Sequence, residues 1–147
     1  MDLAEKNFKH SLKKSVSKEV SSPGKCHFFL FFCPITSRTG TDIDAAVNYL
    51  DEVNTASKPV IMVVLHNTFD PEKIILDSNN AIKREYISAV DCLFSDSGLL
   101  SCQKNTNAIG KIQTDLKSKK WTSYYCLKKD RPLHEPNRKK TFLLLFV

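Results

Sequence analysis

The sequence has few of the residues and patterns that mark special classes of protein. Its 147 residues include only 4 glycines and 6 prolines, which excludes collagen-like and low-complexity chains. Its 5 cysteines form no C-x-x-C pair and are odd in number, so we expect a reducing compartment and no disulfide framework. The H-E-x-x-H pattern is missing too, and we expect neither a metal nor another cofactor.

Long hydrophobic runs are also missing. The longest stretch that resembles a membrane segment, His27–Ile35, is about half the length that a bilayer requires. It follows a polar stretch and lacks a small-residue cleavage site, which disfavours a secretory signal. We therefore expect a soluble, cytoplasmic protein without a membrane contact.

The net charge of +6 is divided unevenly along the chain. Residues 1–25 carry +3 and residues 119–147 carry +6, whereas residues 26–118 carry −3. A protein that reads a nucleic-acid groove normally has its basic residues on the folded face that docks, so specific recognition of nucleic acid is disfavoured. We expect only weak, salt-dependent binding of the two ends to polyanions.

Apolar patterning predicts one small α/β domain at residues 26–118 with basic, poorly structured ends. Residues 1–25 are expected to form a short helix or a disordered tail, and residues 119–147 a basic C-terminal segment. Residues 142–147 either add an edge strand or stay exposed. The apolar stripe of the N-terminal helix is spaced by four: Phe8, Leu12 and Val16.

Two apolar runs on either side of an amphipathic helix predict a βαβ unit. Residues 26–35 and 60–65 are apolar on both faces, as in strands that are buried on both sides of a sheet. The helix between them is expected to begin at Thr41 as N-cap, with Asp44 as a shortened capping box. The apolar face of that helix comprises Ile43, Ala46, Val47, Leu50 and Val53.

The remaining pattern completes a three-layer, Rossmann-like domain with a mainly parallel sheet. Residues 86–94 alternate as a third strand. Residues 74–76 could add a short strand, and a second helix is expected to be capped by Asn105 or Thr106 and to end near Ser118.

The loop that joins the first strand to its helix is the leading candidate pocket, because ligands of open α/β sheets bind outside the carboxyl ends of the strands. Free N–H groups at the helix start and Arg38 could hold a phosphate or a sugar. Asp42 and Asp44 supply negative charge at the same place, which favours a ligand whose hydroxyls meet the carboxylates while its phosphate lies toward Arg38. The alternative is that Thr41 and Asp44 only cap the helix. The predicted ligand-binding residues are Ser37, Arg38, Thr39, Gly40, Thr41 and Asp42.

This loop belongs to a longer motif that resembles a group of uncharacterised small α/β proteins. The shared pattern is F-C-P-[IV]-x-S-R-x-G-T-D-I-[DE]-A-A, here residues 32–46, followed by K-P-V-x-x-V-V-L-H, here residues 58–66. The resemblance continues through V-D-C-L-F at residues 90–94 and G-L-L-x-C at residues 98–102. It covers roughly residues 26–118 and implies the limits of the domain, but no activity.

A looser resemblance is to the lysine-decarboxylase-like phosphoribohydrolases, whose P-G-G-x-G-T-x-x-E signature binds a nucleoside monophosphate on a Rossmann-like fold. Residues 40–44 match the G-T-x-x-acid half. The resemblance implies that Gly40 and Thr41 contact phosphate and that Asp44 is catalytic at the ribose. Ser37 and Arg38 replace the two phosphate-loop glycines, and Asp44 is one methylene shorter than glutamate, which favours binding without turnover.

Cysteine nucleophiles are disfavoured. Four residues separate Cys33 from Arg38, whereas a phosphatase loop requires five, and Pro34 removes an amide that such a loop uses. His66 and Cys92 could pair if their strand ends are adjacent. Because Cys92 lies in an apolar stretch, a packed cysteine is favoured.

The sequence therefore predicts a non-catalytic intracellular binding or interaction module that recognises a nucleotide-like or phosphoribose ligand at residues 36–44. The alternative is a nucleoside-phosphate hydrolase or transferase that uses the same pocket, with Asp44 at the ribosyl centre and Arg38 on the phosphate. A protein partner or a homodimer is the other kind of partner that we expect.

Overall fold

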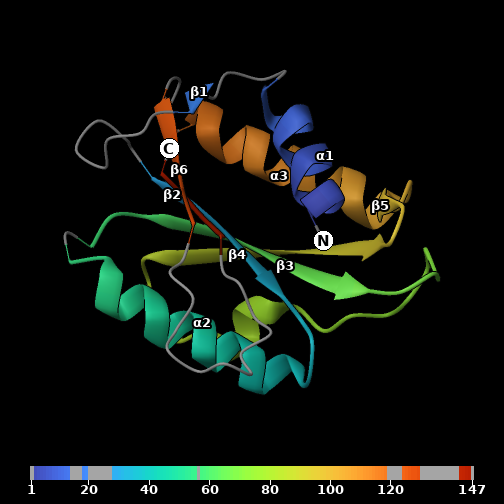
Figure 1. The fold of residues 1–147 in the computed structure, drawn as a ribbon, viewed down its shortest axis with the longest axis horizontal. Coiled ribbons are helices and arrows are strands. Elements are labelled where there is room, and N and C mark those ends of the chain that lie inside the picture. Colours follow the sequence, from blue (N-terminus) through green and yellow to red (C-terminus); the bar gives the residue numbers. More distant parts are fainter. Residues whose placement is uncertain are drawn as a thin grey trace.

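The computed structural model describes residues 2–13, 18–19, 28–55, 57–118, 124–129 and 143–146. A seven-stranded sheet carries helices on both of its faces (Figure 1), which confirms the predicted α/β class. The helices are α1 (Asp2–Lys13), α2 (Thr39–Val53) and α3 (Gln103–Ser118), with a 3-10 helix η2 (Ser78–Ala81). The strands are β1 (Lys18–Glu19), β2 (Phe29–Pro34), β3 (Val60–Asn67), β4 (Ile87–Ser95), β5 (Gly98–Leu99), β6 (Tyr124–Lys129) and β7 (Leu143–Phe146), and their order is β1-β6-β7-β2-β3-β4-β5.

The centre of the sheet is parallel. β2 pairs with β3 from Phe29↔Val60 onward, and β3 pairs with β4 from Val60↔Ile87 onward. The predicted βαβ unit is confirmed, since α2 connects β2 to β3. The predicted third strand is β4. The sheet becomes mixed toward its sides, because β7 runs antiparallel to both β2 and β6, and β5 runs antiparallel to β4.

Two apolar clusters cover the two faces of the sheet, because successive side chains of a strand point to opposite sides. One cluster packs β2, β3 and β4 against α1 and α3, which lie together on one side in Figure 1. The other packs the alternate residues of these strands against α2. The predicted apolar face of α2 is buried at Ile43, Ala46, Val47 and Leu50, whereas Val53 is exposed.

Both ends of the chain contribute regular elements where the structure describes them, unlike the poorly structured ends that the sequence predicted. The predicted N-terminal helix is α1, and its Phe8 and Leu12 are buried. The ring of Phe8 meets the ring of Phe32 edge-on at 5.6 Å between centroids, which ties α1 to β2. Val16 lies outside the described residues. At the other end, β7 lies between β6 and β2 and is therefore not an edge strand.

The predicted start of α2 is wrong. The helix begins at Thr39, its N-cap is Arg38, and the Arg38 side chain makes no capping bond. Thr41 therefore lies inside the first turn. The physical reason is that Asp42, and not Thr41, binds the amides that precede the helix.

Two predictions around β4 are also wrong. Residues 74–76 form no strand, and Ile74 and Leu76 are 91% and 85% exposed. α3 begins at Gln103, so neither Asn105 nor Thr106 is its cap. The side chain of Asn105 instead bonds the main chain of Leu93 from the first turn of α3, and that of Asn79 bonds the main chain of Ala89.

Candidate functional site

The predicted loop folds around the carboxylate of Asp42. Its Oδ2 accepts the main-chain N–H groups of Thr36 at 2.8 Å and Ser37 at 2.9 Å, and its Oδ1 accepts the Ser37 hydroxyl at 3.0 Å. Asp42 is fully buried. The carboxylate thus already occupies the position in which these donors would bind an anionic group. Asp42 stabilises the loop, and its side chain is buried.

The other predicted residues remain on the surface at the start of α2. Ser37, Arg38, Thr39, Gly40 and Thr41 are all exposed, and so is the predicted catalytic Asp44. The first helical bond runs from the N–H of Asp42 to the carbonyl of Arg38 at 2.9 Å, so the three preceding amides point out of the helix end. The structure brings these residues together, but none of them lines the cavity beside β4 that is described below.

A buried polar cluster joins β3, β4 and η2 on the α2 side of the sheet. Oδ1 of Asp91 lies 2.8 Å from Nε2 of His66, and the same oxygen accepts the Ser78 hydroxyl at 2.5 Å. Oδ2 accepts the main-chain N–H of Ser78 at 3.0 Å. The side chains of His66 and Asp91 are only 8% and 9% exposed. Burial raises the pKa of Asp91, but the bonds from His66 and Ser78 outweigh burial and leave that pKa below its ordinary value.

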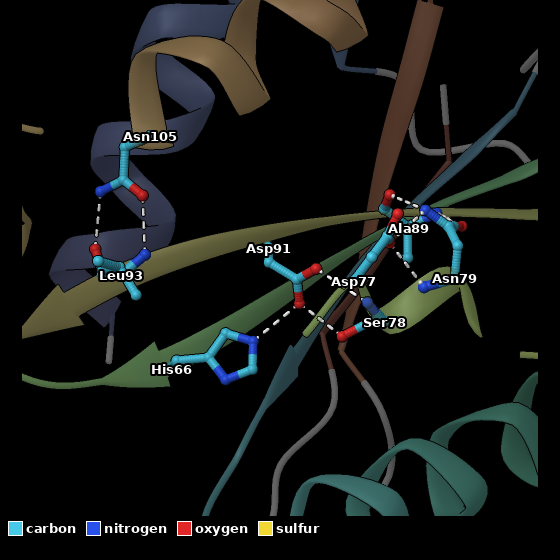
Figure 2. A network of polar contacts seen from close by, with 8 residues as sticks. All are labelled: His66, Asp77, Ser78, Asn79, Ala89, Asp91, Leu93 and Asn105. Atoms are coloured by element: carbon cyan, nitrogen blue, oxygen red, sulfur yellow. Dashed lines mark hydrogen bonds and ion pairs between the residues drawn. The ribbon is translucent and has the colours of Figure 1, made fainter. Parts of the chain in front are cut away.

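The order of these three side chains differs from that of a catalytic triad. In a triad the histidine lies between the carboxylate and the serine and accepts the serine proton. Here Asp91 lies between His66 and Ser78 (Figure 2), and the serine hydroxyl donates to the carboxylate. The cluster therefore holds η2 and β3 against β4 without activating Ser78 as a nucleophile.

Cys92 is packed in the core, as the sequence predicted, and the disfavoured Cys–His pair is not formed. Cys92 is fully buried in the cluster under α1 and α3, on the opposite face of the sheet from the Asp91 carboxylate. Burial, followed by the charge of Asp91, raises the pKa of the Cys92 thiol to about 12. His66 instead bonds Asp91, and no described residue bonds its Nδ1, which lies on the far side of the ring in Figure 2.

Asparagine side chains pair with the outer edge of β4 at two positions. Asn79 accepts from the N–H of Ala89 at 2.9 Å and donates to its carbonyl at 2.8 Å. Asn105 makes the same two bonds with Leu93, both at 2.7 Å. Each carboxamide thus replaces one residue of a neighbouring strand and protects an edge that would otherwise be exposed.

A cavity of about 500 Å³ opens beside the same edge of β4. The strand contributes its floor, the segment before and within η2 forms one wall, and one face of α3 forms the other. Lys104 and Lys111 bring positive charge from α3, whereas Asp77 brings negative charge from the opposite wall. The lining residues are Ile75, Asp77, Asn79, Ala89, Val90, Asp91, Lys104, Asn107, Ala108 and Lys111.

Sequence reasoning missed this region because its polar residues have ordinary local interpretations. Asn79 belongs to a stretch that is typical of a turn, and Asn105 fits a helix cap. The available signal was Asp91, a lone carboxylate in an otherwise apolar strand, because a buried charge requires nearby partners. Nothing in its spacing identified His66 and Ser78 as those partners.

Among the described residues, no three histidine, cysteine, aspartate or glutamate side chains gather as metal ligands. The helices of this part of the chain are too short or too polar to span a membrane. No family model, curated protein or solved structure matches the sequence.

Proposed function

We propose that this chain is a non-catalytic binding module for a nucleotide-like or phosphoribose ligand, and that the ligand occupies the cavity at the edge of β4. The observation that carries the proposal is this cavity, which combines two lysines of α3 with residues of the outer edge of β4, Asp91 among them. Its volume of about 500 Å³ lies within the range of roughly 300–1,000 Å³ that is usual for small-molecule sites.

The charges of the cavity favour an anionic ligand that is bound from the α3 side. Lys104 and Lys111 lie two helical turns apart on one face, about 10 Å along the axis. Their ammonium groups can bind phosphate oxygens with charge-assisted hydrogen bonds. Asp77 on the opposite wall repels a phosphate but accepts hydrogen bonds from sugar hydroxyls, so it favours one orientation of a sugar phosphate.

The polar groups beside the cavity favour binding without turnover. The Asp91 carboxylate accepts three hydrogen bonds from His66 and Ser78, which leaves it poorly placed to act as a base. The Ser78 hydroxyl is committed to the same carboxylate. A nucleophile would need an adjacent base in hydrogen-bond reach, and the cluster offers Ser78 no such arrangement.

The fold assignment is part of the same proposal. Helices on both faces and the parallel centre β2–β3–β4 support a three-layer, Rossmann-like arrangement. In such folds ligands usually bind outside the carboxyl ends of the strands. We place the ligand at the lateral edge of the sheet instead, because the cavity lies there.

The phosphoribohydrolase-like alternative uses residues 36–44 with Asp44 as the catalytic residue. The exposed Asp44 and the open start of α2 favour it, whereas the bonds of Asp42 to Thr36 and Ser37 disfavour it. Its test is the release of base from nucleoside monophosphates. Release that is abolished in Asp44→Asn supports this alternative, and its absence in the wild type excludes it.

Calorimetric titration with AMP and with ribose 5-phosphate tests the binding proposal. We expect both probes to bind, and Lys104→Ala and Lys111→Ala each to weaken binding about tenfold, since a hydrogen bond to a charged group contributes about 1.5 kcal/mol or more. Lys6→Ala, an exposed lysine of α1, is the matched control and should leave affinity unchanged. The absence of binding overturns the proposal. Loss of binding in Arg38→Ala with no effect of the two α3 variants moves the site to the loop.

A further inference from the structure

Four residues of β4 turn their main-chain groups to its outer edge: Ile87, Ala89, Asp91 and Leu93. Carboxamides occupy two of these positions, and the N–H of Ile87 bonds the carbonyl of Arg84. The carbonyls of Tyr86 and Phe94 bond β3, so the odd-numbered residues between them face away from β3. Ala89 and Leu93 bond the carboxamides of Asn79 and Asn105. No described residue bonds the main-chain N–H and carbonyl of Asp91, which lie midway between these two pairs.

The unoccupied position lies within the cavity. Asp91 lines the cavity together with Ala89 and Val90. Main-chain N–H and carbonyl groups are strong hydrogen-bonding groups, and an unpaired donor and acceptor at a sheet edge offer a place for a further partner to bind. The groups of Asp91 are therefore available to a ligand in the cavity that offers the complementary acceptor and donor.

The two asparagines show which kind of group fits this edge. Each presents a planar carboxamide, with an acceptor and a donor side by side, at distances of 2.7 to 2.9 Å from the strand. The 6-amino group and the N1 atom of an aminopurine, or the edge of a cyclic amide, present the same pair. The positive charge of Lys104 and Lys111 lies on a wall of the same cavity.

We propose that a purine nucleotide binds with the base edge paired to the main chain of Asp91 and its phosphate on the lysines of α3. This inference rests on the proposed function and specifies which protein groups recognise the base. The occupied neighbours disfavour a peptide strand as the ligand, because an added strand would have to displace the Asn79 and Asn105 side chains to continue its ladder. A single base needs only the one free position.

Three probes separate base recognition from phosphate binding: AMP, purine riboside 5′-monophosphate, which lacks the 6-amino donor, and ribose 5-phosphate. In calorimetric titrations we expect AMP to bind about tenfold more tightly than purine riboside 5′-monophosphate, since the missing donor leaves the Asp91 carbonyl unpaired. Ribose 5-phosphate should bind more weakly still. Equal affinity for all three overturns the base pairing but leaves the proposed function standing, whereas no binding of any probe overturns both.

Amide hydrogen exchange gives an independent readout at the residue itself. In the free protein the Asp91 amide should exchange faster than those of Ala89 and Leu93, because only the latter two are hydrogen-bonded at this edge. AMP should slow the exchange of Asp91, and ribose 5-phosphate should not. An Asp91 amide that stays unprotected at saturating AMP contradicts the inference even if AMP binds.

Discussion

Asp91 bonds His66 of the neighbouring parallel strand through Oδ1, at 2.8 Å from Nε2, and it lines the cavity at the sheet edge, to which the alternation of β4 turns its main chain. One residue thus stabilises the interior of the sheet with its side chain and offers an unpaired donor and acceptor to the cavity with its backbone. Because these two roles use different atoms, they can be tested separately.

Removal of the Asp91 carboxylate should destabilise the fold. Asp91→Ala leaves His66 and both donors of Ser78 without their acceptor, and we expect the free energy of unfolding to fall by about 3 kcal/mol. Urea unfolding measures the change. Asp96→Ala, at an exposed carboxylate of the turn after β4, should change stability by less than about 0.5 kcal/mol. Similar effects of both variants would show that the cluster contributes little.

The same carboxyl should make stability depend on acid pH. Hydrogen bonds from His66 and Ser78 outweigh the effect of burial and hold the pKa of Asp91 below its ordinary value of 3.8. A carboxyl with a lowered pKa in the folded state stabilises the fold above its unfolded pKa, and this stabilisation is lost as the pH falls below it. We expect the free energy of unfolding to decline below about pH 4. The decline should be smaller in Asp91→Asn, and an identical decline would contradict the assignment.

The asparagine that pairs with Leu93 should be critical for stability. Asn105 is buried and bonds both main-chain groups of Leu93 and the carbonyl of Leu100. Asn105→Ala leaves the Leu93 N–H without its partner, whereas the Leu93 carbonyl keeps the N–H of Leu100. We expect a loss of about 2–3 kcal/mol in urea unfolding. Asn48→Ala, at an exposed position of α2, is the control and should be nearly neutral. A neutral Asn105→Ala would mean that water replaces the amide without cost.

Two neighbouring aspartates of the predicted loop should differ sharply in their effect on stability when they are truncated. Asp42→Ala removes the acceptor of Thr36 and Ser37 from a fully buried position, so we expect a loss of about 2–3 kcal/mol. Asp44→Ala removes an exposed side chain and should change stability by less than about 0.5 kcal/mol. Thermal unfolding of the two variants side by side measures the difference. A stable Asp42→Ala would remove the role given to this carboxylate.

The thiols should differ sharply in reactivity. Cys92 is fully buried with its pKa raised to about 12 by burial, whereas Cys102 is partly exposed. The thiolate is the reactive form, so iodoacetamide at pH 8 should modify Cys102 long before Cys92. Peptide mass spectrometry of a time course distinguishes them, and denaturant should remove the difference. Early modification of Cys92 in the native protein would contradict its placement in the core.

The elements that were predicted well are those whose burial is periodic. β2 and β3 are apolar on both faces because both apolar clusters pack against them, and α1 and α2 carry stripes at helical spacing. The start of α2 was misplaced because Asp42, six residues after Thr36, closes the loop through its side chain. The capping pattern in the sequence reflects only local hydrogen bonds, and it therefore favoured Thr41 as the N-cap of this helix.

The sequence by itself determined the central strands β2, β3 and β4 and the existence of the three long helices, because alternation and helical spacing record which side chains leave water. Only the tertiary structure decided that β7 lies beside β2 and that β5 pairs with β4 only at Phe94 and Ser95, which leaves the earlier part of this edge to side chains. The hydrogen-bond partners of Asp91, Ala89 and Leu93 also depended on the tertiary structure. A polar side chain can bond any complementary group, and its position in the sequence does not show which group that is. The cavity exists where α3 and the η2 segment approach this edge from opposite sides, and no single stretch of the chain encodes that approach.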